Sequence, residues 1–108
     1  MASREQRNAR PNRESLSKRL GRRVTLALHA RDGGCCVYCR ATAETSGAPL
    51  QLDHLTPRSL GGADAPTNLV LACRVCNRTR STTPLATWCR QLGMDARALR
   101  RHAATVSL

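Results

Sequence analysis

Two cysteine motifs, CVYC at residues 36–39 and CRVC at residues 73–76, give this sequence its clearest structural signal. Two residues between a pair of cysteines let both thiolates of a tight turn bind one ion about 2.3 Å away. Two such turns complete a closed tetrahedral site, so we expect Cys36, Cys39, Cys73 and Cys76 to hold a structural Zn²⁺ ion. A redox pair or a disulfide is the alternative, and the doubling of the motif makes it the weaker one.

The composition explains why such a chain would need a metal. Its 108 residues include no Phe, one Trp and one Tyr, so few large aromatic side chains are available to stabilise a core. Domains of this size bury a small share of their surface and often depend on a metal or on disulfides. Because the binding energy of a structural zinc ion adds to the folding energy, the four cysteines would compensate for the thin core.

The charge of the chain points to a polyanionic partner. The formal net charge is +11, and Lys18 is the only lysine among the 18 basic residues. Each contact with a phosphate releases condensed counterions, and arginine pairs with phosphate through two hydrogen bonds, so nucleic acid is the expected partner. No apolar stretch is long enough to span a membrane and no signal-peptide pattern is present, so we expect no membrane association and a cytoplasmic location.

The sequence divides into a basic arm, a central domain and a helical extension. Residues 1–23 are polar and basic and predict a flexible or partly helical arm, residues 24–82 form the domain with both cysteine motifs, and residues 83–108 predict a C-terminal helical extension. Hydrophobic patterning and capping residues predict a helix at 24–30, strands at 50–55 and 68–72, and helices at about 75–81, 84–93 (capped by Thr83) and after Asp95. These elements indicate an α+β fold with a small sheet flanked by helices.

The segment between the cysteine motifs carries chemistry of its own. It contains LDHLTP at residues 52–57 and TNLVLAC at residues 67–73, and the second motif continues as CNRTR to residue 80. In this order the pieces resemble the HNH (His-Me finger) endonuclease family over residues 31–81. The resemblance implies a ββα-metal core, in which a β-hairpin and a helix surround one catalytic divalent cation and the zinc site holds hairpin and helix together.

The resemblance also implies a role for each residue of this pattern. His54 would act as the general base that activates water, since imidazole titrates near neutral pH. Asp53 and Asn77 would bind the catalytic cation, and Asn68 would accept the hydrogen bond that orients the ring of His54. Asn77 stands where the third letter of the family name has histidine, and its neutral amide oxygen suits Mg²⁺ or Mn²⁺.

The expected reaction is hydrolysis of phosphodiester bonds in double-stranded DNA, as in small nucleases of phages and mobile elements. Three arginines are candidates for phosphate contacts: Arg58, Arg78 and Arg80. The oligomeric state stays open, a monomer included. The alternative function is a non-catalytic zinc-binding module that docks on nucleic acid or on a protein, although this alternative gives no reason for the pattern around His54.

Overall fold

A pair of short antiparallel strands lies at the centre of the molecule. In the computed structural model, which describes residues 16–108, strand β2 (Gln51–His54) pairs with strand β3 (Leu69–Ala72), with Gln51 opposite Ala72 and His54 opposite Leu69. The connection between the strands contains two 3₁₀ turns, η2 (Arg58–Leu60) and η3 (Pro66–Asn68). Both strands lie where the hydrophobic pattern predicts them, each one or two residues shorter.

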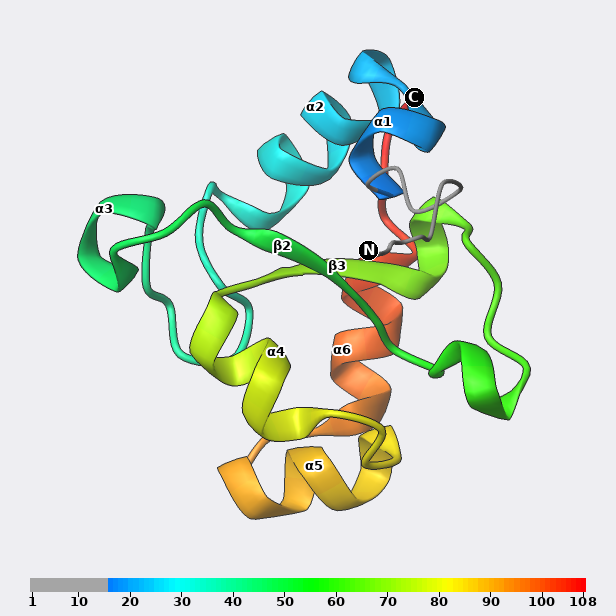
Figure 1. The fold of residues 1–108 in the computed structure, drawn as a ribbon. Coiled ribbons are helices and arrows are strands. Elements are labelled where there is room, and N and C mark those ends of the chain that lie inside the picture. The colour runs from blue at the N-terminus through cyan, green and yellow to red at the C-terminus, as the bar shows by residue number, and fades with distance from the viewer. Residues whose placement is uncertain (1–15) are drawn as a thin grey trace, which may run out of the picture.

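Six helices surround this pair in the part of the chain that the structure describes (Figure 1). They are α1 (Leu16–Leu20), α2 (Arg22–Asp32), α3 (Ala43–Ser46), α4 (Arg74–Arg80), α5 (Leu85–Leu92) and α6 (Ala96–Ala103). Figure 1 shows α1 and α2 on one side of the strand pair and α4 and α5 on the other. The predicted α+β character is therefore confirmed as a mixture of helices with one small sheet.

The helix ends follow the expected chemistry at two of three positions. Gly93 ends α5 in the left-handed conformation with a φ of 71°, which glycine adopts without strain. The side chain of Asp95 caps α6 by accepting hydrogen bonds from the main-chain N–H groups of Arg97 and Ala98. Thr83 does not cap α5 as expected, because Pro84 occupies the capping position and makes no side-chain hydrogen bond there.

The described part of the predicted N-terminal arm is mostly helical. Residues 1–15 of this arm, 1–23, lie outside the described residues. Residues 16–20 form α1 and residues 22 and 23 open α2, which agrees with the partly helical form of the arm. The hydroxyl of Thr25 in α2 donates hydrogen bonds to the main-chain oxygens of Ser17 and Gly21, which holds α1 against α2.

The hydrophobic core is small and is built around β3, all four residues of which are buried. Tyr38 and Trp88 meet edge to face with ring centroids 5.5 Å apart, so the only two aromatic side chains of the sequence pack on each other. The core cluster comprises Cys36, Val37, Tyr38, Leu55, Val70, Ala72, Cys73, Leu85, Trp88, Cys89, Leu99 and Ala103. Because two of the motif cysteines, Cys36 and Cys73, are core residues, the expected zinc site is continuous with the core.

A buried carboxylate, Asp32, ties the first and last parts of the domain together. It accepts hydrogen bonds from Arg31 Nε at 2.8 Å and from the main-chain N–H of Leu71 at 2.9 Å, and His102 Nε2 lies 2.6 Å from its Oδ1. Burial alone would raise the pKa of Asp32, but the hydrogen bonds from Arg31, Leu71 and His102 lower this pKa on balance. Asp32 thereby joins α2, β3 and α6.

No helix in residues 16–108 is long and apolar enough to cross a membrane.

Candidate functional site

The four motif cysteines come together beside the strand pair. Cys36 and Cys39 lie in the turn that follows α2, Cys73 caps α4, and Cys76 lies in the first turn of that helix. Their four sulfur atoms all lie within 4.8 Å of one another, and Cys39 Sγ is 3.6 Å from Cys73 Sγ. Four sulfurs bound tetrahedrally at ~2.3 Å from a zinc ion lie roughly 3.8 Å apart. The predicted clustering of these cysteines is confirmed, and the spacing fits a metal ion.

The local environment of the cluster also fits a cation. Main-chain N–H groups point at two of the sulfurs, from Cys39 to Cys36 Sγ at 3.5 Å and from Cys76 to Cys73 Sγ at 3.4 Å. Burial, followed by the neighbouring sulfur atoms, raises the pKa of Cys76, and a bound cation favours the thiolate form in such a cluster. Cys35 is not part of the group, since its Sγ lies 3.4 Å from the main-chain oxygen of Gly33.

A separate cavity of about 340 Å³ lies where β2 ends, between the following loop and α4. It brings together four of the predicted site residues: Asp53, His54, Arg58 and Asn77. Adjacent side chains on a regular strand point to opposite faces. Asp53 and His54 both reach the cavity because β2 ends at His54, where the chain turns towards Pro57.

Asp53 is a buried carboxylate with its two oxygens in different surroundings. Its Oδ2 accepts hydrogen bonds from Tyr38 Oη at 2.6 Å and from Arg80 Nη1 at 2.8 Å. Burial, together with the adjacent Asp53 carboxylate, raises the pKa of Tyr38, so the phenol stays protonated and can donate. Within residues 16–108, Asp53 Oδ1 has no hydrogen-bond partner. One oxygen of Asp53 therefore remains available to the cavity.

Asn77 reaches the cavity from the first half of α4. Its Nδ2 donates a hydrogen bond to Gln51 Oε1 at 2.7 Å, which links α4 to the start of β2. Its Oδ1 accepts no hydrogen bond from any residue that the structure describes. Asp53 and Asn77 thus offer the cavity one carboxylate oxygen and one amide oxygen, the hard ligands that Mg²⁺ and Mn²⁺ prefer.

His54 forms a close pair with a residue that sequence analysis does not identify. Its Nε2 lies 2.7 Å from Asp64 Oδ1, and the side chains of His54 and Asp64 are 17% and 28% exposed. Arg19 Nη2 lies 3.1 Å from Asp64 Oδ2, and Arg58 Nε lies 3.8 Å from Asp64 Oδ1. The hydrogen bond from His54 is the main reason that the pKa of Asp64 lies below its usual value, and Arg58 and Arg19 lower it further.

Asn68 does not contact the ring of His54 as the resemblance implies. Its Oδ1 accepts a hydrogen bond from the main-chain N–H of Thr56 at 2.9 Å. Its Nδ2 donates to the main-chain oxygens of Thr56, at 3.1 Å, and of Ala63, at 2.9 Å. Because both polar atoms of the amide are used in this way, Asn68 closes the loop after His54, and the ring itself is contacted by Asp64.

Arg80 is placed in the interior, which does not fit the phosphate contact expected for it. Its side chain is 0% exposed. It donates five hydrogen bonds to acceptors from three parts of the chain: Tyr38 Oη, Asp53 Oδ2 and the main-chain oxygens of His54, Leu55 and Thr83. Because each of its three guanidinium nitrogens donates within the fold and its side chain is not exposed to solvent, Arg80 is a structural residue that holds Asp53.

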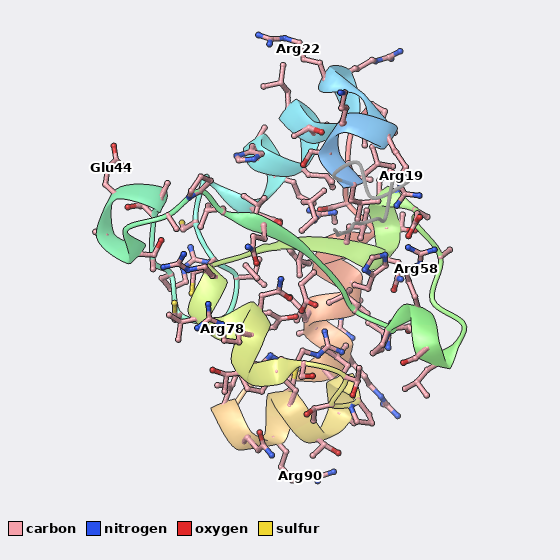
Figure 2. All side chains as sticks on the ribbon, viewed as in Figure 1. Arg19, Arg22, Glu44, Arg58, Arg78 and Arg90 are labelled. Carbon is pink, nitrogen blue, oxygen red and sulfur yellow. The ribbon has the colours of Figure 1, made fainter. Side chains whose placement is uncertain are left out.

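The other two candidate phosphate contacts lie on the surface. The side chain of Arg58 is 64% exposed at the edge of the cavity, and Arg78 is exposed on α4, one residue after Asn77 (Figure 2). Arg58 is therefore next to the predicted site. Arg78 does not line the cavity but lies on the helix that does.

The structure adds Asp64 and Tyr38 to the residues around the site. Asp64 lies in a loop without hydrophobic periodicity, so no pattern in the sequence relates it to His54. Tyr38 lies inside the first cysteine motif, where its position predicts a turn and gives no sign of its hydrogen bond to Asp53, 15 positions along the chain. The composition gives one weak indication that the acidic residues form ion pairs, since the chain has only 7 of them among 18 basic residues.

Comparison with known proteins agrees with this geometry. Residues 36–83, which include both cysteine motifs and the cavity residues, match the model of the HNH endonuclease family. The CRISPR-associated endonuclease Cas9 of Actinomyces naeslundii is 40% identical over 63 residues, and Cas9 of Corynebacterium diphtheriae is 31% identical over 61 residues. Each match covers 56% of this chain but only 6% and 5% of the respective relative, so the chain spans a small fraction of their length. No solved structure matches it.

Proposed function

Since residues 36–83 match the model of the HNH endonuclease family, we propose that this chain is a metal-dependent endonuclease that hydrolyses phosphodiester bonds in double-stranded DNA. The observation that carries the proposal is the cavity at the end of β2, where an imidazole, a carboxylate oxygen and an amide oxygen converge. The order of β2, β3 and α4 along the chain, with β2 and α4 lining the cavity, supports a ββα-metal core.

The catalytic cation would be held by Asp53 Oδ1 and Asn77 Oδ1, neither of which has a hydrogen-bond partner among residues 16–108. Water and phosphate oxygens would complete its coordination, as is usual for Mg²⁺. When bound, a divalent cation neutralises the negative charge that develops on the phosphate and on the leaving oxygen. Arg80 and Tyr38 fix the other oxygen of Asp53 and so orient the carboxylate.

His54 supplies the general base. Its Nε2 is engaged by Asp64, so Nδ1 is the nitrogen that takes the proton from the attacking water. The water oxygen then forms the new bond to phosphorus as the bond from phosphorus to the 3′ oxygen breaks, and the departing 3′ oxygen takes up a proton from solvent. The expected products carry a 5′-phosphate and a 3′-hydroxyl.

The surroundings of the cavity support binding of a nucleic acid. Arg58 at its edge and Arg78 on α4 are exposed cations that can contact the phosphate backbone. The net charge of +11 adds long-range attraction, which predicts binding that weakens steeply with salt. The four-cysteine cluster would hold a structural Zn²⁺, because a closed site of four thiolates leaves no position open for a substrate.

The test compares three zinc-loaded proteins on supercoiled plasmid: wild type, His54→Ala and His29→Ala. The His29 variant is the matched control, because this histidine lies on α2 and does not line the cavity. Each protein is assayed without added divalent metal, with Mg²⁺ and with Mn²⁺. Zinc content and melting temperature are measured on all three, so that loss of activity can be separated from loss of fold.

We expect wild type and the His29 variant to convert supercoiled DNA to nicked circles only when Mg²⁺ or Mn²⁺ is present. The His54 variant should bind the same DNA and retain its zinc but lose at least about 100-fold in rate, the usual contribution of a general base. DNA binding without cleavage by the wild type would favour a non-catalytic binding module instead. Equal cleavage by all three proteins would remove His54 from the mechanism.

A further inference from the structure

The pairing of His54 with Asp64 determines which ring nitrogen carries the proton. An ionised carboxylate has no proton and can only accept a hydrogen bond. A contact of 2.7 Å between Asp64 Oδ1 and His54 Nε2 therefore requires the proton on Nε2. Because a neutral imidazole carries one proton, the lone pair is then on Nδ1.

Two arginines hold Asp64 in its charged form and in place. Arg19 binds Oδ2 at 3.1 Å, and Arg58 lies on the side of Oδ1 at 3.8 Å. Figure 2 shows Arg19 and Arg58 on the same side of the molecule, at the end of the strand pair where the loop begins. Arg19 belongs to α1, outside residues 36–83, so the helix before the family domain contributes to the position of Asp64.

The backbone around Asp64 is fixed as well. Asn68 donates a hydrogen bond to the main-chain oxygen of Ala63, the residue before Asp64, and pairs with both main-chain groups of Thr56. Gly62 packs directly on the main chain of Thr56, so closely that an added Cβ would lie 1.7 Å from the main-chain oxygen of Thr56. The loop therefore presents Asp64 to His54 at a defined position.

We propose that Asp64 is the positioning residue of His54, which fixes the orientation of the imidazole and keeps the proton on Nε2, so that Nδ1 is free to act as the base. This proposal rests on the nuclease function proposed above. It assigns Asp64 the part that a buried carboxylate plays beside the histidine of a hydrolytic triad, where it sets the tautomer and takes no proton itself.

The first test reads the tautomer directly and needs no activity. The full chain is labelled with ¹⁵N-histidine, and long-range ¹H–¹⁵N spectra are recorded at a pH high enough to keep imidazoles neutral. In the wild type, His54 should show a single tautomer with Nε2 protonated and a protected downfield Nε2–H resonance. In Asp64→Asn that resonance should be lost and both tautomers should appear, because an amide can donate to Nε2 as well as accept from it.

The second test measures nicking by wild type, Asp64→Asn and Glu44→Ala. Glu44 is the matched control, since its removal changes the net charge by the same amount and it lies on α3, on the opposite side of Figure 2 from Arg19 and Arg58, which contact Asp64. We expect kcat of Asp64→Asn to fall on the order of 10–100-fold without a rise in KM, and Glu44→Ala to match the wild type. The fall should be smaller than in a fully buried triad, because the Asp64 side chain is 28% exposed.

The two tests together separate the positioning role from the proposed function. A changed tautomer with reduced kcat supports the proposal. An unchanged His54 spectrum in Asp64→Asn overturns it, and so does a variant that cleaves as fast as the wild type or faster, since Asp64 would then restrain the ring without assisting it. If the wild type itself does not cleave DNA, the nuclease function fails, while the spectra still decide whether Asp64 sets the tautomer.

Discussion

Replacing Arg80 tests whether this arginine is part of the interior, as the structure places it, or a surface cation, as its position in a basic helix predicts. Arg80→Ala removes five hydrogen bonds and leaves the buried carboxylate of Asp53 without its cationic partner. Removing one partner of a buried ion pair costs about 3–5 kcal/mol, because the other charge stays buried and unpaired. We therefore expect the melting temperature to fall by roughly 12–40 °C, at about 4–8 °C per kcal/mol for a small domain.

The assay is thermal unfolding of the zinc-loaded protein at a fixed zinc concentration, because bound metal itself raises stability. Arg78→Ala is the matched control, since Arg78 is an exposed arginine on the same helix, and its loss should change stability by less than about 0.5 kcal/mol. If Arg80→Ala does not fold, Arg80→Lys measures the same interaction, because lysine keeps the charge but loses the planar fork of donors. Equal melting temperatures for the Arg80 and Arg78 variants would refute the buried ion pair.

Three further predictions follow from the structure. Gly62→Ala should destabilise the loop by about 1–3 kcal/mol, because its Cβ would meet the main-chain oxygen of Thr56 at 1.7 Å; an unchanged melting temperature would contradict this. The pKa of Asp32 is lower in the folded protein than in the unfolded chain, so the unfolded chain takes up a proton first as the pH falls. The ionised carboxylate therefore stabilises the fold above about pH 4, and this stabilisation is lost as the pH falls through the folded-state pKa. The free energy of unfolding, measured against pH, should fall less steeply in acid for Asp32→Asn than for wild type. The purified protein should contain one zinc ion per chain, and a chelator strong enough to remove this ion should unfold the wild type cooperatively. A Cys73→Ser variant that keeps both its zinc and its fold would argue against the four-sulfur site.

The sequence predicts those features that depend on neighbours along the chain. Two cysteines separated by two residues form a turn around a metal wherever the turn lies, so the motifs at 36–39 and 73–76 identify the cluster without knowledge of the fold. The positions of the strands follow from the local hydrophobic pattern, and Gly93 and Asp95 determine helix ends because capping is a local interaction. The same local reasoning fails at Thr83, where two capping signals are adjacent and the proline takes the position.

The sequence does not predict contacts that the fold alone brings together. Arg80 lies in the helical pattern of a basic surface, and its burial depends on Asp53, 27 positions earlier, and on Tyr38, 42 positions earlier. Asp64 lies in a loop, where no periodicity indicates which way a side chain points. Asn68 illustrates the same limit, since the family pattern identifies the residue as important but does not distinguish contact with the His54 ring from closure of the loop after it.

Three cavity side chains each divide their polar atoms between the fold and the cavity, which lets one small domain combine a rigid fold with an accessible site. Asp53, His54 and Asn77 each have two polar atoms, and each uses one of them to hold the fold: Oδ2 on Arg80, Nε2 on Asp64 and Nδ2 on Gln51. The second atom has no partner among residues 16–108, and all three side chains line the cavity. Orientation is therefore fixed before any ligand binds, which is what a catalytic constellation requires. Asn68 and Arg80 differ in that all their polar side-chain atoms are used within the fold, so their replacement should act on stability and on the placement of the site. Replacement of His54 removes one contact, to Asp64, and should act mainly on the chemistry.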